Sequence, residues 1–204
     1  SYTLSSTKIK APVRLAVVSD LHSTVYGPDQ KRLLDKLRQS RCDLILMPGD
    51  IIDDIKPLQG AEMFLDQVSA IAPCYYCTGN HENIETLITL PEVKARVRQA
   101  GITVLDKTRE TITIRGTKLT LCGVDDPRKY AYIDRDQQEE VQLMNELGSM
   151  QDCPEYTILL AHRPERSPIY AQFGFDLIVS GHAHGGQVRR SEEHTSELQS
   201  LAYL

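Results

Sequence analysis

The chain has 204 residues, of which 41% are hydrophobic, so it can bury one good core and is expected to fold as a single domain. Its formal net charge of −5 at pH 7, without any run of Lys or Arg, argues against a protein that coats nucleic acid. No apolar run approaches the roughly 18 residues that span a bilayer, and no signal peptide is visible.

Strands and amphipathic helices alternate in the first part of the chain. Apolar runs and leucines at helical spacing predict strands over 13–19, 43–48 and 74–78, and helices over 29–37 and about 61–71. This order is typical of a largely parallel sheet with right-handed crossovers.

The pattern then changes from parallel units to a hairpin. Residues 84–99 favour a helix that is interrupted or restarted at Pro91, and a strand is expected over 102–105. Segments 111–115 and 118–122 alternate with period two around Gly116-Thr117, which predicts a β-hairpin in a second, antiparallel part. A helix over about 136–148 and strands ending at His162 and Ser180 complete the chain.

Five cysteines form no disulfide framework, because their number is odd and their spacing is irregular. This usage fits a reducing compartment and favours a location in the cytoplasm or at the membrane periphery. Cys74 and Cys77 form a CxxC pair that could indicate a redox or zinc site. The pair lies in a predicted buried strand without a second CxxC, so we favour buried, small hydrophobic side chains.

The stretch Val179-Ser-Gly-His182-Ala-His184-Gly-Gly indicates a metal site. Residues at i and i+2 of extended backbone point to the same side, so His182 and His184 can face one cavity. Five of the six histidines follow apolar runs directly, where an α/β sheet delivers side chains beyond the carboxyl ends of its strands. The other polar groups at such ends are Asp20-Leu21-His22, Gly49-Asp50, Gly79-Asn80-His81 and His162.

Together these strand ends supply too many ligands for one ion. The candidate ligands are Asp20, His22, Asp50, Asn80, His162, His182 and His184. Each of them alone has an ordinary interpretation as a helix cap, turn former or core histidine, and their joint occurrence makes the metal hypothesis preferable. A carboxylate such as Asp50 can bridge two ions about 3.5–4 Å apart. Mixed nitrogen and oxygen ligation favours two divalent ions of Mn, Fe, Zn, Co or Ni over Mg or Ca.

These motifs resemble the calcineurin-like metallophosphoesterase family. All five of its blocks are matched in order between residues 20 and 184: Asp20-x-His22, Gly49-Asp50, Gly79-Asn80-His81-Glu82, His162 and Gly181-His182-Ala183-His184. The blocks Ala161-His-Arg-Pro-Glu165 and Gly181-His-Ala-His-Gly-Gly-Gln187 are similar to the bacterial YkuE/YaeI-type branch of phosphodiesterases. Some members of that branch are attached to membranes, and one line cleaves a nucleotide-linked lipid precursor.

The resemblance implies a four-layer α/β/β/α sandwich of two mixed sheets with a dinuclear centre at the loop edge. Asp20, His22 and His184 would hold the first metal, Asp50 would bridge, and Asn80, His162 and His182 would hold the second. A metal-bridging hydroxide would attack phosphorus in line. His81 would protonate the leaving group, and Asn80 would also contact the phosphoryl oxygens.

Four further residues have open or ordinary interpretations. Glu82 and Arg163 could orient a ligand or contact phosphate, or could simply lie on the surface. Asp53 and Asp54 are expected to be solvated loop charges.

The expected substrate is a phosphodiester, which the resemblance allows to be lipid-linked or nucleotide-linked. Without an obvious cap insertion between the blocks the site is expected to be open, which suits a diester with a bulky leaving group. We expect a monomer, and allow for membrane association through a segment upstream of Ser1. The alternatives are a non-catalytic binding or scaffold protein of the same fold, and an inactive truncated fragment.

The last residues depart from the family pattern. The segment Arg190-Ser-Glu-Glu-His-Thr-Ser-Glu-Leu-Gln-Ser200 resembles the translation of a widely used sequencing adapter. We therefore expect a phosphoesterase domain over residues 1–189 that is incomplete at its C-terminus, and a non-native tail over 190–204. His194 lies in this tail and is expected to have no function.

Overall fold

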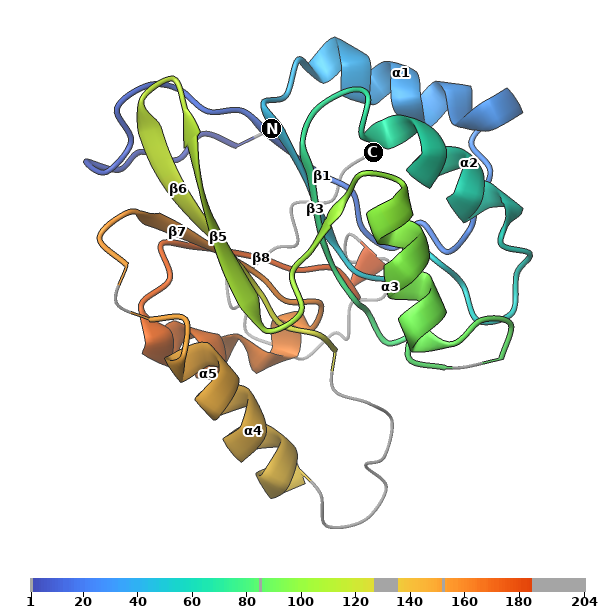
Figure 1. The fold of residues 1–204 in the computed structure, drawn as a ribbon. Coiled ribbons are helices and arrows are strands. Elements are labelled where there is room, and N and C mark those ends of the chain that lie inside the picture. The colour runs from blue at the N-terminus through green and yellow to red at the C-terminus, as the bar shows by residue number, and fades with distance from the viewer. Residues whose placement is uncertain (1, 85, 127–135, 152, 185–204) are drawn as a thin grey trace, which may run out of the picture.

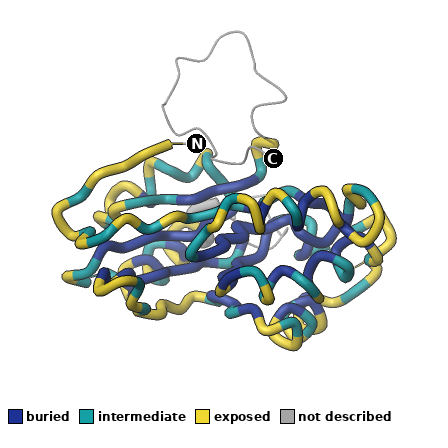
Figure 2. Tube along the Cα trace, turned by 90° about the horizontal axis from the view of Figure 1, so that it is seen from above, coloured by how far each residue is buried: buried dark blue, intermediate teal, exposed yellow. Residues whose placement is uncertain are grey.

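The computed structural model describes residues 2–84, 86–126, 136–151 and 153–184. The tail predicted over 190–204 lies outside these residues. Two four-stranded sheets face each other, and helices cover the outer face of each sheet (Figure 1). The predicted four-layer α/β/β/α sandwich is therefore confirmed. Figure 2 shows the buried stretches running through the middle of the layers, with exposed segments at the periphery.

The first sheet has the strand order β1-β2-β3-β4, and all of its described strands run parallel. The prediction that both sheets are mixed is therefore wrong for this sheet and holds only for the second. Its strands are β1 (Leu15–Val17), β2 (Leu44–Pro48), β3 (Cys74–Cys77) and β4 (Thr103–Val104). The crossovers contain α1 (Lys31–Ser40), α2 (Gln59–Val68) and α3 (Leu90–Gln99), and a short 3-10 helix, η1 (Pro28–Gln30), precedes α1. Because all strands run the same way, their carboxyl ends meet at one edge of the sheet.

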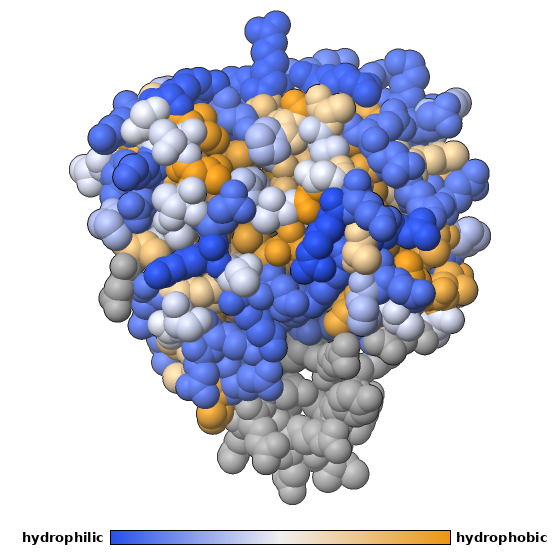
Figure 3. All heavy atoms as spheres, in the orientation of Figure 1, coloured by the Kyte–Doolittle hydropathy of each residue, from blue (hydrophilic) through white to orange (hydrophobic). Residues whose placement is uncertain are grey.

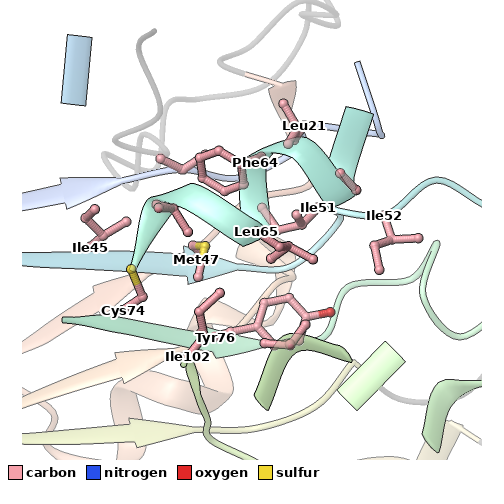
Figure 4. Packing of buried hydrophobic residues seen from close by; sticks show 14 of the residues in the cluster. Leu21, Ile45, Met47, Ile51, Ile52, Phe64, Leu65, Cys74, Tyr76 and Ile102 are labelled. Carbon is pink, nitrogen blue, oxygen red and sulfur yellow. The ribbon is translucent and has the colours of Figure 1, made fainter. Parts of the chain in front are cut away.

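The helices of this half bury one face of the first sheet. Alternate residues of a strand point to opposite sides, so Ile45 and Met47 of β2 face the helices. Figure 4 shows Phe64 and Leu65 of α2 over these two side chains, with Tyr76 of β3 beside them.

The second sheet contains the predicted hairpin and two parallel strands, in the order β5-β6-β7-β8. Its strands are β5 (Thr108–Ile114), β6 (Thr117–Gly123), β7 (Tyr156–Leu160) and β8 (Leu177–Val179). The turn residues are Arg115 and Gly116, both at positive φ, and Thr117 already pairs with Ile114. The turn thus lies one residue earlier than Gly116-Thr117, because a two-residue hairpin turn of this twist needs positive φ at both central positions.

The outer face of the second sheet is covered by α4 (Asp136–Gly148), α5 (Ser167–Tyr170) and the 3-10 helices η2 (Pro164–Arg166) and η3 (Ala171–Phe173). Leu143 and Leu147 of α4 and Tyr170 of α5 belong to one buried cluster with Leu159 of β7. Between the sheets, Leu44 and Leu46 share a second cluster with side chains of β6 and β7.

Two details of the first half bear on the sequence predictions. The predicted helix over 84–99 begins only at Leu90, because Thr89 and Glu92 form a capping box and Pro91 occupies the first turn. Cys74 and Cys77 are buried in β3, as expected of small hydrophobic side chains, and burial raises the pKa of the Cys74 thiol to about 12.

Among the described residues, no helix has both the length and the apolar character needed to cross a bilayer. Hydrophilic residues predominate on the face seen in Figure 3, with apolar residues in small groups between them.

Candidate metal centre

Loops from both sheets meet at the carboxyl ends of β1, β2, β3, β7 and β8. There six of the seven side chains predicted as metal ligands, all but Asn80, come together in two groups, in each of which one ligand atom per residue lies within 4.8 Å of the others. One group is Asp20, His22 and His184, and the other is Asp50, His162 and His182. The residues are far apart in sequence, so only the packing of the two sheets brings them into contact.

Asp50 lies between the two groups. Its Oδ2 atom is 3.1 Å from Nε2 of His162 and 3.7 Å from Nε2 of His22. Its other oxygen, Oδ1, accepts a hydrogen bond of 2.9 Å from the backbone N–H of His81. Burial alone would raise the pKa of Asp50, but the hydrogen bond and charge of His162 lower it to about 2. Asp50 is therefore an ionised carboxylate with one oxygen directed between two imidazoles.

The side chains of the first group direct lone pairs of electrons toward a common point. Nε2 of His22 is 3.2 Å from Nε2 of His184, with the two rings almost parallel. Nδ1 of His22 lies 3.1 Å from Asp53 Oδ2, and donation of its proton there leaves Nε2 as an acceptor. Asp20 Oδ1 accepts the backbone N–H of His182 at 2.8 Å, whereas its buried Oδ2 has no hydrogen-bond partner among the described residues. A cation would satisfy these converging atoms.

The second group is oriented by the backbone. His162 Nδ1 donates to the carbonyl oxygen of Pro48 at 2.8 Å, which aims its Nε2 at the site. That Nε2 is also 3.1 Å from Oδ1 of Asn80. The ring of His182 lies edge-on to the His162 ring, with 5.1 Å between centroids. Imidazole, amide and carboxylate donors thus converge here, as the ligation of a divalent transition metal requires.

The loops that carry these side chains have unusual backbone conformations. Five of the candidate ligands have φ between 45° and 66°, a region that non-glycine residues seldom adopt: Asp20, His22, Asp50, His182 and His184. Gly49 also has positive φ, and a Cβ there would lie 2.5 Å from the nitrogen of Gly79. Such strain persists where the surrounding structure enforces it and is typical of functional sites.

Glu82 ties two of these loops together. Its carboxylate is buried and accepts backbone N–H groups from Asp50, Ile51, Ile52 and Gly79 at 2.7–3.0 Å. Burial, and then the charge of Asp50, raise the pKa of Glu82 to about 7. Of the interpretations left open by the sequence, surface exposure is wrong, and Glu82 orients the loop of Asp50.

Asp53 and Asp54 are not solvated loop charges. Asp53 is buried and contacts His22, and Asp54 Oδ1 lies 2.6 Å from Nδ1 of His81. His81 itself is partly exposed, and its ring packs edge-on against the His22 ring. The sequence feature that could have identified Asp53 and Asp54 as site residues was their position three and four residues after Asp50, within the same strand-end loop.

Arg163 is held by a residue that the sequence analysis missed. Its Nε and Nη2 atoms donate to the two carboxylate oxygens of buried Asp126, at 2.6 and 3.2 Å. Asp126 follows the end of β6, the same kind of position that identified the other site residues. This ion pair fixes the segment that follows His162.

The comparisons with known proteins agree with this geometry. The family described as "Calcineurin-like phosphoesterase" matches residues 13–186. The chain belongs to the calcineurin-like phosphoesterase family. This membership confirms the family predicted from the strand-end motifs.

Curated relatives of this chain are longer than the region matched. A Caenorhabditis elegans metallophosphoesterase relative is 31% identical over 187 residues, which are 86% of this chain and 37% of that protein. The phosphodiesterase YaeI of Escherichia coli is 26% identical over 184 residues, 88% of this chain and 63% of YaeI. The chain therefore spans less than two thirds of either relative.

A solved structure shows the same fold. Phosphopantetheinyl hydrolase (PptH) from Mycobacterium tuberculosis aligns with a TM-score of 0.58 at 16% identity, covering 86% of this chain and 84% of that chain.

Metal binding to this protein is expected to release about one proton from His162 at pH 7.5. Burial disfavours the imidazolium, but the hydrogen bond and charge of Asp50 raise the pKa of His162 to about 9. Burial lowers the pKa values of His22 and His182, so these rings are already neutral. Calorimetric titration with Mn²⁺ in two buffers of different ionisation enthalpy measures the release. A binding enthalpy that is the same in both buffers would contradict this expectation.

Proposed function

We propose that this chain is a metal-dependent phosphodiesterase whose two divalent ions share Asp50. Asp20, His22 and His184 would hold one ion, and Asn80, His162 and His182 would hold the other. The observation that carries the proposal is the position of Asp50 Oδ2, within 3.7 Å of an imidazole nitrogen from each group. Bound there, two such ions would activate water as the nucleophile and neutralise charge on the phosphoryl oxygens.

The residues of the chain then orient the reactants. Glu82 holds the loop of Asp50 against that of Asn80 through four backbone N–H groups, which keeps the bridging oxygen in place. Asn80 presents its amide next to His162, where its nitrogen can also reach a phosphoryl oxygen.

His81 is the proposed general acid. Its Nδ1 is paired with Asp54 at 2.6 Å, an arrangement that fixes the orientation of the ring and directs Nε2 away from Asp54. Its partial exposure leaves the ring accessible to a substrate. A proton on Nε2 can pass to the departing alkoxide as the ester bond breaks.

Diester specificity is supported by the relationship to YaeI, which is described as a phosphodiesterase. We would test manganese first. Nitrogen and oxygen donors without thiolate suit this ion, and they also suit Fe, Zn, Co and Ni.

The test is hydrolysis of bis(4-nitrophenyl) phosphate beside 4-nitrophenyl phosphate, with Mn²⁺ and with a chelator. We expect Mn²⁺-dependent turnover of the diester at least about tenfold faster than of the monoester, and loss of both with the chelator. Faster turnover of the monoester would overturn the diester assignment. Thermal unfolding with and without Mn²⁺ is the control, since bound metal at about 100 times its Kd stabilises by about 2.7 kcal/mol. Stabilisation without turnover would instead indicate a binding protein.

A further inference from the structure

The ligands proposed for the second ion come from both sheets. Asn80 follows β3 of the first sheet, whereas His162 and His182 follow β7 and β8 of the second. The side chains of Asn80 and His162 meet at 3.1 Å across this boundary. Distances from a metal to its ligands vary by only about 0.2 Å, so contacts outside the ligand set have to fix the spacing of these loops.

Asp126 contacts both loops although it is not among the proposed ligands. It is the third residue after β6, and it is 4% exposed. Its backbone N–H donates to Oγ1 of Thr78 at 3.2 Å, and its carbonyl oxygen accepts from Nδ2 of Asn83 at 2.8 Å. Thr78 and Asn83 lie on either side of Asn80 in the sequence. The main chain of Asp126 is therefore attached to both ends of the Asn80 loop.

The side chain of Asp126 holds the other loop. Its two oxygens accept from Nε and Nη2 of Arg163 at 2.6 and 3.2 Å, and paired hydrogen bonds of this kind are among the strongest that arginine makes. Because the carboxylate is buried, salt and water screen this attraction less than they would at the surface. Arg163 directly follows His162. One residue thus joins the loop of Asn80 to the loop of His162.

The residue before Asp126 anchors the same segment. Asp125 Oδ1 accepts from the Thr78 hydroxyl at 2.9 Å. Lys94 of α3 donates from Nζ to Asp125 Oδ2 at 2.5 Å and to Asp106 Oδ2 at 2.6 Å. The segment that follows β6 is therefore tied to a helix of the first sheet as well as to the Asn80 loop, which keeps Asp126 in place.

We propose that Asp126 is a positioning residue for the second metal ion, because it keeps the loops of Asn80 and His162 at the spacing that this ion requires. The inference rests on the proposed function, since it takes these two residues and His182 to hold that ion. None of the ligands proposed for the first ion alone lies on either loop. Removing the carboxylate should therefore weaken the binding of one ion and spare the other.

The test measures metal binding and not turnover. We would titrate Mn²⁺ into the full chain by calorimetry, where the wild type should bind two ions. Asp126→Asn keeps the shape of the side chain and removes the charge that binds Arg163. It should bind the second ion about 10-fold to 100-fold more weakly. Affinity for the first ion should stay within about twofold of wild type. Unchanged binding, or equal weakening of both ions, would overturn the inference.

Electron paramagnetic resonance gives a readout that a loss of general stability would not produce. Two neighbouring Mn²⁺ ions couple magnetically, whereas a single bound ion gives an uncoupled signal. At the Mn²⁺ concentration that fills both wild-type sites, Asp126→Asn should show the uncoupled signal. A coupled signal of wild-type size would contradict the proposal.

A second variant separates positioning from an unpaired charge. Loss of one partner from a buried ion pair strongly destabilises a fold. The double variant Asp126→Asn/Arg163→Gln removes both charges together. If the two residues act as a pair, it should lose as much affinity for the second ion as Asp126→Asn alone. Wild-type affinity in the double variant would show that the unpaired guanidinium caused the effect, and would overturn the inference.

Two further variants serve as references. His182→Ala removes a ligand of the second ion and so defines the state with one ion. In that background Asp126→Asn should leave the affinity for the remaining ion unchanged, and a further loss would overturn the selectivity for one ion. Asp43→Asn is the matched control, because Asp43 accepts from both Nη1 and Nη2 of Arg115 at the amino end of β2, away from the site. It should change the binding of neither ion.

The two proposals fail in different ways. A wild-type protein that binds two ions without turning over the diester would overturn the catalytic proposal, and selective loss of one ion in Asp126→Asn would still support the inference. Turnover by the wild type with no selective loss in Asp126→Asn would overturn the inference alone. A wild-type protein that binds a single ion would overturn both.

Discussion

Replacing Asp50 by Ala is expected to lower kcat/KM for the aryl phosphodiester by about 10³-fold or more, a loss of about 4 kcal/mol of transition-state stabilisation. The side chain is 1% exposed, and Oδ2 is its only oxygen directed at both imidazole groups. In the proposed centre this oxygen is the single ligand common to both ions. Its removal therefore weakens both metal positions together, whereas loss of one histidine would affect mainly one of them.

The same substitution has a second readout that does not depend on turnover. Asp50 is what holds the pKa of His162 near 9 against the effect of burial. Without the carboxylate, burial leaves that imidazole neutral at pH 7.5, so the proton released on metal binding should disappear. Steady-state kinetics and calorimetry in two buffers measure the two effects.

Asp35→Ala is the control for the loss of a carboxylate. Asp35 lies on α1, where it pairs with Lys31 and Arg38 away from the loop edge. Its replacement should leave both kcat/KM and the proton release unchanged. Normal turnover by Asp50→Ala would rule out the shared-ligand arrangement.

Replacing Glu82 by Gln is expected to destabilise the metal-free protein by about 1–3 kcal/mol at pH 8, because the loss of hydrogen-bond acceptors is partly offset by the removal of a buried charge. Each carboxylate oxygen accepts two backbone N–H groups: Oε2 from Asp50 and Gly79, and Oε1 from Ile51 and Ile52. A Gln amide would direct its own N–H donors at one of these pairs. Two buried donors would then lose their acceptor, which costs about 1–3 kcal/mol for each group.

The choice of pH follows from the pKa of Glu82, which burial and the charge of Asp50 raise to about 7. Above that value the carboxylate is ionised and can accept all four hydrogen bonds. Because folding raises the pKa of Glu82, the stability that Glu82 contributes falls as the pH rises toward 7, so the destabilisation by Gln should be larger at pH 5.5 than at pH 8. Urea unfolding of both proteins measures it, with Glu140→Gln on the exposed surface of α4 as the control. A change below about 0.5 kcal/mol would show that the loops do not depend on this carboxylate.

Much of the fold and of the candidate site was predictable from local sequence patterns. β2 and β3 were visible as continuous apolar runs, α1 as leucines at helical spacing and the hairpin as alternation with period two. The positions of the candidate ligands followed from the same information, because each of them lies within five residues of the end of a strand, and parallel strands deliver their carboxyl ends to one edge. The family blocks then placed all of them in one set.

Other features depended on contacts between distant segments, which no periodicity encodes. Asp53 and Asp54 read as ordinary loop charges, and only the positive φ values in the β1 and β2 loops turn His22 toward Asp53. In the sequence, Glu82 cannot be distinguished from a surface residue. Its role is visible only in the structure, where four backbone N–H groups donate hydrogen bonds to its carboxylate.

The sequence by itself determined most strands and helices of this protein, the edge at which its site lies and the residues offered as ligands, because burial and strand ends are local properties. The four layers followed from the family resemblance. Tertiary structure alone decided which side chains pair: Asp126 with Arg163, Asp54 with His81, and Asp50 between two imidazole groups. It also placed the segment around Ile55 between the loops that follow β1 and β3. Such pairings depend on how the two sheets and their strained loops pack, and the packing involves residues more than a hundred positions apart.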